Sequence, residues 1–483
     1  MNALGVIEGP QGAAALWSTI DWTRVRRHVS RLQARIVKAV RAGKWHLVRC
    51  LQRLLAGSFA AKLLAVQRVS SNRGKHTAGV DGLVLETPAQ KWRQAQQLNA
   101  KDYKPKPLRR IYIPKKNGKR RPLGIPTQAD RAEQALELLA LDPVAETLAD
   151  RSSYGFRRER STQDAMAGCF LALCRQQSAE WILEGDIRAC FDALSHAWLL
   201  EHVPTEQRKL RGWLNAGFME RGVFYPTTEG TPQGGILSPT AANMALDGLQ
   251  RRLQARFLGR QKVNLVRYAD DFIITGASPT LLAGEVKPLV QQFLTERGLE
   301  LSEAKTRIVH IDDGFDFLGF NVRKYKGKLL ITPAKSSSAA AKDKVRGILT
   351  TGSSLSQEVL IRRLNPVIRG WGNYYRHVVS KEVFSDIDHA IWRMTWNWAT
   401  RRHPQKGHKW VKDRYYAHRD GRDWVFTDGS VRLFRMASIP IRRHVKIRGD
   451  ANPYDPQHAG YFAERHARQG AVPPALAPAW LLP

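Results

Sequence analysis

The sequence predicts an α+β protein with more than one domain, and three observations support this prediction. Short apolar runs alternate with segments of helical periodicity through the middle of the chain, as the strands and helices of an α+β fold would. The chain has 483 residues, whereas an ordinary domain contains roughly 100–200. Its composition, 43% hydrophobic and 25% charged residues, is typical of a globular protein with a sizeable core.

The charge of the chain is strongly positive. Lys and Arg total 77 against 43 Asp and Glu, and the formal net charge is +34. A field of this sign and size attracts polyanions, so nucleic acid is the expected partner.

Cysteine usage and the N-terminal residues predict a compartment. The four cysteines match no zinc-binding spacing, so we expect packed, reduced thiols and exclude a secreted disulfide scaffold. No basic residue occurs from Met1 to Trp17, unlike the start of a signal peptide, and no apolar stretch is long enough to cross a bilayer. The prediction is a soluble, cytoplasmic protein with no membrane partner.

The first strongly periodic segment, Trp22–Leu55, predicts a basic amphipathic helix. Its apolar positions at helical spacing are Val25, Val29, Leu32, Ile36 and Val40, and the interleaved arginines are Arg24, Arg27, Arg31, Arg35 and Arg41. A solvated face on a packed helix and a face that contacts phosphate explain the arginines about equally well.

Local patterns place the next elements. A helix is expected over Gln90–Gln97, a strand around Ile111–Ile113 and another helix over Gln128–Ala149. Lys115–Arg121 reads KKNGKRR, and its Asn-Gly pair suits the positive φ angles of a tight hairpin turn. Small and polar residues over Pro333–Lys344 indicate a linker or domain boundary. Beyond it, Trp392 and Trp396 stand one helical turn apart, which favours a core stripe over a base-stacking platform.

Two carboxylate sites carry the chemistry. An apolar strand in Trp181–Asp192 delivers Asp186, and two apolar strands in Asn264–Gly276 flank a turn containing Asp270 and Asp271. Adjacent acids between hydrophobic strands are costly unless a cation neutralises them, and Mg²⁺ prefers carboxylate oxygens together with substrate phosphates. Two such ions, about 3.5–4 Å apart, catalyse in-line phosphoryl displacement. Only folding can bring Asp186 and Asp270 together.

Eight sequence blocks in one order give these acids their context, and with them the chain resembles the group II intron reverse transcriptases and maturases. The blocks are Ser71–Gly82, Ile111–Arg131, Ser153–Ala165, Glu184–Asp192, Gly230–Leu246, Tyr268–Asp271 (YADD), Leu301–Ile308 and Phe315–Phe320. The resemblance implies a right-hand polymerase with fingers, palm and thumb.

The resemblance also implies roles for single residues. Asp186, Asp270 and Asp271 match the metal-binding acids of the family, which hold two Mg²⁺ ions. Phe191 matches the aromatic gate that excludes a ribose 2′-hydroxyl. Lys115 and Arg121 match the fingers cations that grip the incoming triphosphate.

Further roles are implied around these residues. Gln233 stands where the family contacts nucleotide and template, with Gly234 and Gly235 allowing close backbone approach. Lys305 resembles the lysine proposed to protonate pyrophosphate, and Leu318–Gly319 resembles the loop that holds the primer end. Ala189 replaces the glycine that members often carry. Asp192 is assigned a structural or capping role.

The later part of the chain resembles the maturase domain of the family, the thumb equivalent that grips intron RNA. The matching segments are Leu364–His377, Phe384–Pro404, His408–Tyr416 and Ile439–Pro456. The expected parts are a basic helical extension over residues 1–65, fingers and palm over 66–330, a mostly helical maturase or thumb domain over 331–430, and a basic DNA-binding remnant over 431–483.

One departure from the family concerns the end of the chain. Many members continue into an HNH endonuclease with paired zinc-binding cysteines, but no cysteine follows Cys190 here. The segment after Phe462 is rich in Ala and Pro, so we expect no endonuclease activity. His444, Asn452 and His458 are expected to be surface or nucleic-acid-facing residues rather than metal ligands.

The function implied is an RNA-directed DNA polymerase that also binds its intron RNA to assist splicing and mobility. Its expected partners are group II intron RNA, an RNA template, a DNA primer or target, and dNTPs. Two rival hypotheses are a splicing-only RNA-binding protein with an idle polymerase site and a host-domesticated repair polymerase. The intact set of Asp186, Asp270 and Asp271 argues against the first rival, and an intron RNA flanking the gene would discriminate the second.

Overall fold

The computed structural model describes residues 10–114, 118, 120–232 and 234–470. These residues form two compact units, each described here by itself. Unit 1 comprises the described residues up to Ala165, Leu183–Ile308 and those from Ile447 onward; unit 2 comprises Met166–Ile182 and Val309–Lys446. Both units combine helices with sheets, which confirms the predicted α+β class.

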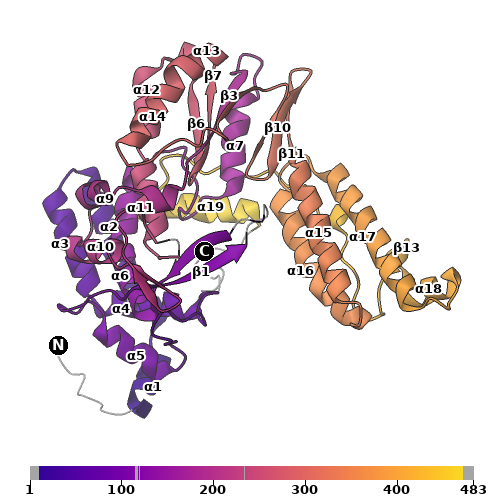
Figure 1. Cartoon of the computed structure of the whole chain (residues 1–483), viewed down its shortest axis with the longest axis horizontal. Helices are drawn as coiled ribbons and strands as arrows, with labels where there is room; N and C mark the ends of the chain where they lie inside the picture. The colour runs from indigo at the N-terminus through magenta and orange to yellow at the C-terminus, as the bar shows by residue number, and fades with distance from the viewer. Residues whose placement is uncertain (1–9, 115–117, 119, 233, 471–483) are drawn as a thin grey trace. The chain divides into compact units, whose positions relative to one another are not determined.

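A group of helices opens unit 1 and surrounds one long buried helix, α6 (Gln128–Leu148) (Figure 1). The other helices of the group are α1 (Pro10–Ser18), α2 (Trp22–Arg41), α3 (Trp45–Gly57), α4 (Phe59–Ser71) and α5 (Pro88–Gln97), of which α1 packs against α5 and α5 against α4. Helix α6 packs against α2, α3 and α4, so apolar residues from all four form one core. The helices predicted over Gln90–Gln97 and Gln128–Ala149 are confirmed.

The predicted basic amphipathic helix is confirmed over α2, but its predicted length was wrong. Val29, Leu32 and Ile36 are buried while the interleaved arginines are exposed. The helix ends just before Gly43, where φ is +65°, and a separate helix α3 follows. The apolar spacing continues across the break, so periodicity alone could not locate it.

The first sheet of unit 1 has the strand order β2-β1-β4-β5. Its strands are β1 (Leu108–Pro114), β2 (Arg120–Ile125), β4 (Phe218–Glu220) and β5 (Val223–Tyr225). Strands β1 and β2 pair antiparallel, with Pro114 opposite Arg120, which confirms the predicted strand and the hairpin. Lys115 and Asn117 of its turn lie outside the described residues.

The second sheet has the order β6-β7-β3-β8. Its strands are β3 (Trp181–Asp186), β6 (Asn264–Tyr268), β7 (Asp271–Gly276) and β8 (Arg307–His310). A Cβ on Gly185 of β3 would lie 2.2 Å from the Phe272 ring of β7, so this glycine lets the ring pack against the strand. The buried centres of β6 and β7 explain why both segments read as apolar runs.

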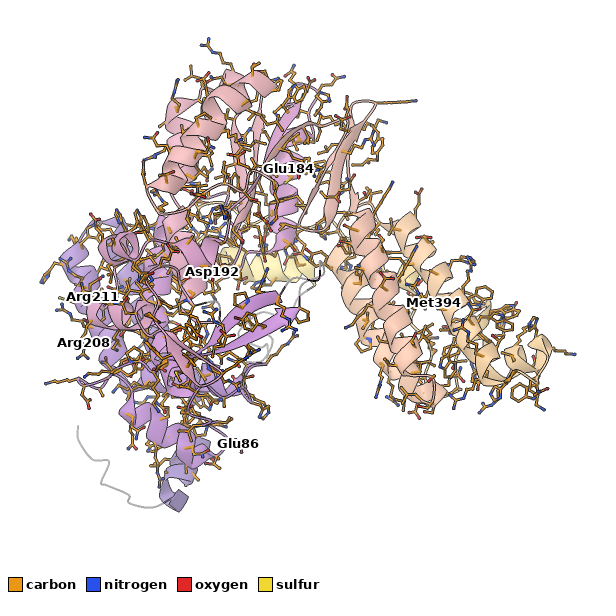
Figure 2. All side chains as sticks on the ribbon, viewed as in Figure 1. Glu86, Glu184, Asp192, Arg208, Arg211 and Met394 are labelled. Atoms are coloured by element: carbon orange, nitrogen blue, oxygen red, sulfur yellow. The ribbon has the colours of Figure 1, made fainter. Side chains whose placement is uncertain are left out.

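Short helices complete unit 1. They are α8 (Cys190–Ala193), α9 (His196–His202), α10 (Gln207–Leu214), α11 (Ser238–Leu246), α12 (Leu249–Arg256), α13 (Pro279–Leu281) and α14 (Lys287–Thr295). On α10, Arg208 and Arg211 are exposed (Figure 2), whereas Lys209 is buried and donates to Glu133 and Glu137 of α6. This buried ion pair ties α10 to the central helix.

Unit 2 contains a three-stranded sheet, a set of long helices and a hairpin. Helix α7 (Thr162–Leu173) leads from unit 1 into it. Its other elements are β9 (Phe315–Phe317), β10 (Phe320–Tyr325), β11 (Lys328–Pro333), α15 (Lys335–Thr351), α16 (Gln357–Tyr375), α17 (Lys381–Arg402), α18 (His408–Tyr415), β12 (Tyr416–Arg419) and β13 (Arg422–Phe426). The sequence indicated a linker or a domain boundary over Pro333–Lys344, and the linker was wrong: the small residues of this stretch instead form the first turns of α15. Alanine is the strongest helix former, and the three alanines of this stretch outweigh its serines.

The chain returns to unit 1 after unit 2. From Ile447 it runs through a short 3₁₀ turn, Pro456–His458, into helix α19 (Ala459–Gln469). Asn452 is buried and donates from its side chain to Thr147 at 3.0 Å, so it has a packing role. None of the helices in the described ranges is long and apolar enough to cross a bilayer.

Candidate active site

The structure places the predicted acids at the ends of adjacent strands. Asp186 is the last residue of β3, and Asp270 and Asp271 occupy the tight turn between β6 and β7. Tyr268 pairs with Asp271 across this turn, and Ala269 between them has a φ of +58°. A left-handed alanine is uncommon and is maintained only where the surrounding structure fixes it.

The three carboxylates act on one another electrostatically. Burial raises the pKa of Asp271 to about 6, and the charges of Asp270 and Asp186 add to the rise. Burial and the charge of Asp186 likewise raise the pKa of Asp270. Such repulsion between partly buried acids is relieved by a cation. No three His, Cys, Asp or Glu side chains among the described residues are already arranged closely enough to hold one metal ion.

Lys305 supplies a positive charge beside these acids. Its ammonium donates to Asp186 Oδ2 at 2.8 Å, and this hydrogen bond raises the pKa of Lys305. The backbone supports the arrangement, because Ser302 N donates to Asp186 O at 2.8 Å and Lys305 N donates to Ser302 O. The lysine side chain is 67% exposed, so it can change partner at little cost.

Arg121 reaches the same site from the first sheet. It lies on β2 opposite Ile113, and its charge opposes the rise in the pKa of Asp270. Lys115 and Gln233, which are also predicted nucleotide contacts, lie outside the described residues. Gly234 has a φ of +127°, and a Cβ there would lie 2.6 Å from the carbonyl oxygen of Gly124 on β2. The backbone at Gly234 therefore approaches β2 closely.

Phe191 lies on α8, five residues after Asp186. Its carbonyl oxygen accepts from Thr231 N at 2.6 Å, which ties α8 to the segment Gly230–Pro232. Ala189 caps the helix with a φ of +46°, the conformation that a glycine adopts without strain. Asp192, labelled in Figure 2, follows on the same short helix and is exposed.

Sequence reasoning missed a buried arginine behind the acids. Arg267 of β6 is fully buried and donates to Asp247 at 2.5 Å, to Asn243 at 3.1 Å and to the carbonyl oxygen of Ala269 at 3.2 Å. It therefore fixes the turn that carries Asp270. An arginine inside an otherwise apolar strand was the available signal, because a buried charge needs a built set of partners.

Phe156 was also missed. Its ring centroid lies 6.4 Å from that of Phe191, with the rings nearly perpendicular. Phe156 belongs to the block Ser153–Ala165, and no local pattern in that block marks it as a neighbour of Phe191.

The predicted primer-holding loop lies in unit 2. Leu318 and Gly319 form the turn between β9 and β10 with φ values of +52° and +83°. The hydroxyls of Tyr374 and Tyr375 on α16 donate to the carbonyl oxygens of these two residues at 3.1 and 3.0 Å. Two tyrosines therefore fix the loop to helix α16 of the same unit.

Aromatic side chains also cluster near the end of unit 2. The rings of Trp392 and Trp396 stack at 6.5 Å, and Trp424 of β13 lies edge-on to both. Both stacked rings are half-buried and Trp424 is 38% exposed. The expected core stripe is thus only partly buried.

Three family models match successive parts of the chain. The N-terminal domain of reverse transcriptase matches residues 17–98, the reverse transcriptase (RNA-dependent DNA polymerase) matches residues 113–322, and the maturase-specific domain of group II introns matches residues 338–416. The second match contains all three acids, and the third covers most of the helices of unit 2.

Curated relatives agree with these matches. Protein YkfC of Escherichia coli is 33% identical over 53% of this chain and 79% of its own length. The group II intron-encoded protein LtrA of Lactococcus lactis is 30% identical over 54% of each chain. An uncharacterized 91 kDa protein in the cob intron of Schizosaccharomyces pombe is 25% identical over 68% of this chain and 51% of its own length. The chain thus spans about half the length of the last two relatives.

These matches confirm the predicted polymerase class, in which a reverse transcriptase domain precedes a maturase domain. The chain belongs to the family of group II intron reverse transcriptases and maturases.

Proposed function

We propose that the chain is the RNA-directed DNA polymerase of a group II intron and that it binds the intron RNA to assist splicing and mobility. The observation that carries the polymerase proposal is the meeting of Asp186 with Asp270 and Asp271, three mutually repelling acids on adjacent strands. Clustered acids repel one another unless a cation neutralises them. A protein that only binds RNA has no use for a cluster with this cost.

The metal chemistry follows from these donors. Asp186, Asp270 and Asp271 offer the hard carboxylate oxygens that Mg²⁺ prefers. A pair of Mg²⁺ ions, when bound, would activate the primer 3′-hydroxyl and neutralise charge on the leaving pyrophosphate. Lys305 would then leave Asp186 and face the leaving group.

The nucleotide would be held from the first sheet. A guanidinium such as that of Arg121 binds phosphate oxygens in pairs, and its effect on the pKa of Asp270 supports a place beside the metals. We propose that Lys115 and Gln233 complete the triphosphate and template contacts. Phe191 would exclude a ribose 2′-hydroxyl and so favour dNTPs.

RNA binding is proposed for two basic surfaces. The exposed arginines of α2 form the first. On unit 2 the half-buried tryptophans lie among cations, with Lys412 Nζ 5.0 Å from the ring centroid of Trp424. Cations bind phosphates and exposed rings stack on bases, which is the usual composition of a single-strand binding site.

The experiment that tests the proposal is extension of a DNA primer on an RNA template with dNTPs and Mg²⁺, using the purified full chain. We expect complementary DNA from the wild type and none from Asp270→Asn. Intron RNA binding, measured by filter retention, should remain largely unchanged in the same variant. Equal extension by the variant would remove the assignment of the acids.

A salt series tests the electrostatic part of RNA binding. RNA binding that depends on lysine and arginine contacts weakens steeply with salt because counterions are released. Splicing of the intron RNA with Asp270→Asn protein tests whether the maturase function stands without polymerase chemistry. Splicing assistance together with an inactive wild-type polymerase would favour the splicing-only hypothesis.

A further inference from the structure

The segment Ser153–Ser161 lies directly beside the turn of acids. Tyr154 N donates to Arg267 O at 2.9 Å, and Arg267 N donates to Ser152 O at 2.9 Å, so the segment pairs with β6 just before the turn. A Cβ on Gly155 would lie 2.4 Å from Ala269 N. Asn243 donates from its side chain to Gly155 O at 2.7 Å and holds this approach. Movement of the segment would therefore move the turn.

Phe156 is the next residue of this segment. It has a φ of +55°, a conformation that bulky residues rarely adopt, and its side chain remains 57% exposed. The exposed ring packs against the Phe191 ring in a T-shaped arrangement, with 6.4 Å between the ring centroids and 78° between the ring planes. Neither burial nor local conformational preference explains this placement, so other contacts must fix it.

Two arginines of the segment, Arg157 and Arg160, attach it to neighbouring elements. Arg157 pairs with both carboxylate oxygens of Glu146 at 2.8 and 2.7 Å, and it donates to the carbonyl oxygens of Asp150 and Ser153. Arg160 shares Glu146 and also donates to Gly449 O at 3.2 Å. Gly449 belongs to the part of the chain that returns from unit 2.

The strap, defined here as Ile447–Gln469, supplies the remaining contacts. Arg465 of α19 pairs with both oxygens of Asp164 at 2.9 and 3.1 Å and donates to Glu159 O at 3.0 Å. Ile447 N donates to the same Asp164 carboxylate at 2.7 Å, so both ends of the strap are attached there. The side chains of Arg465 and Asp164 are only 4% and 0% exposed.

Further contacts fix the turn after Phe156. His466 of the strap lies 2.7 Å from Glu159 Oε2, and Glu159 itself has a φ of +62°. Phe156 and Tyr454 of the strap line the same small cavity. The strap thus contacts the segment at Glu159, the second of its two left-handed residues, and at Arg160, which follows it.

We infer that the strap is a positioning element of the polymerase centre and that Phe156 is a positioning residue for the nucleotide sugar, acting through Phe191. This inference rests on the proposed function, because it takes Phe191 to be the surface that meets the sugar. The strap fixes the segment, the segment fixes Phe156, and Phe156 limits the movement of the Phe191 ring. A looser Phe191 would admit a 2′-hydroxyl.

The experiment measures kcat/KM for a dNTP and for the matching rNTP in single-nucleotide primer extension. An aromatic pair contributes interaction free energy beyond its buried area. Losing it in Phe156→Ala should lower the preference for the dNTP over the rNTP by about threefold to tenfold. Phe170→Ala is the matched control, since Phe170 is a similarly exposed phenylalanine, 46%, outside the site. A folded Phe156→Ala enzyme with the wild-type preference would overturn the role of Phe156.

The strap is tested by a pair of arginine variants on one helix. Arg465→Met removes the buried contacts, whereas Arg468→Met removes only an exposed pair with Glu464. We expect Arg465→Met to lower the dNTP preference and Arg468→Met to leave it unchanged. The Phe156→Ala/Arg465→Met double variant should lower the preference no further than Phe156→Ala alone. Additive effects would overturn the proposed route through Phe156.

A milder change covers the case in which Arg465→Met fails to fold. Glu159→Gln weakens the contact with His466 while it keeps the size of the side chain, and it should shift the nucleotide preference in the same direction. An unchanged preference in the folded Glu159→Gln enzyme would overturn the role of the strap. If the wild type extends no primer with any nucleotide, the proposed function fails, and that outcome is distinct from every one above.

Discussion

Lys305 Nζ lies 2.8 Å from Asp186 Oδ2, so the ammonium pairs with an acid that we propose as a metal ligand. The two residues are 119 positions apart in the chain, and their contact joins the end of β3 to the turn that precedes β8. The geometry places the lysine beside the proposed metal site, where a divalent ion would compete with it for Asp186.

The first prediction concerns Lys305. If its ammonium protonates the leaving pyrophosphate, Lys305→Met should lower the single-turnover rate of nucleotide addition by about 100-fold, the lower end of general-acid contributions. Rapid chemical quench at saturating dNTP measures this rate. Lys342→Met is the control, because Lys342 also pairs with an acid, Asp386, and both residues belong to unit 2. A wild-type rate in Lys305→Met would reduce the lysine to a counter-ion.

The second prediction concerns Ala189. Its φ of +46° lies in the left-handed region, which costs an alanine about 1 kcal/mol and a glycine almost nothing. Ala189→Gly should therefore raise the free energy of unfolding, measured in urea, by about this amount. Ala339→Gly, an exposed position inside α15, should lower it by a similar amount because glycine weakens a helix. A loss of stability in both variants would contradict the assigned strain.

The third prediction concerns the buried ion pair on α10. Lys209 Nζ lies 2.7 Å from Glu137 and 3.2 Å from Glu133, and all three side chains are at most 7% exposed. Lys209→Met would leave two buried acids without a cation and should cost about 3–5 kcal/mol of stability. Lys342→Met breaks a pair with the largely exposed Asp386 and should cost less than about 1 kcal/mol. Urea unfolding of both variants compares them, and equal losses would refute the distinction.

The fourth prediction is a pH dependence that comes from Asp142. Burial raises its pKa to about 6, although the hydroxyls of Thr240 and Tyr454 each donate to it at 3.2 Å. An unfolded aspartate has a pKa of about 4. Between these values the folded state binds more protons than the unfolded state, so the contribution of Asp142 to stability falls as pH rises from about 4 to 6, by about 3 kcal/mol.

Asp142→Asn tests this sign, because an amide does not titrate. The stability of the variant relative to the wild type should increase between pH 4.5 and pH 7.5, as measured by urea unfolding at both values. Asp386→Asn, at an exposed position, is the control and should show little change with pH. A constant difference between Asp142→Asn and wild type would contradict the raised pKa.

The sequence predicted those features that depend on local patterns. Apolar runs around Asp186 and Asp270 indicated strands, and the structure has β3, β6 and β7 there. Helical periodicity likewise identified α2, yet it ran on through Gly43, where a left-handed residue ends the helix. The small residues after Pro333 predicted a linker or a domain boundary where a helix begins, because composition alone cannot tell a helix from a flexible stretch.

Long-range contacts could not be predicted in this way. Asp164 and Arg465 pair across 301 positions, and neither lies in a pattern that indicates the other. Phe156 is similar, since its position depends on the pairing of its segment with β6 and on the strap. Charged residues in buried positions, such as Arg267, were the usable signal, because each must have partners somewhere in the fold.

The central claim is that Asp186, Asp270 and Asp271 together hold the divalent ions of a polymerase. The most direct test counts bound Mn²⁺ by electron paramagnetic resonance in a complex with RNA template, chain-terminated DNA primer and dNTP. Our prediction is two ions per chain for the wild type and for Asp192→Asn, and a loss of ion binding in Asp270→Asn. Two tightly bound ions in Asp270→Asn, at the wild-type affinity, would contradict it.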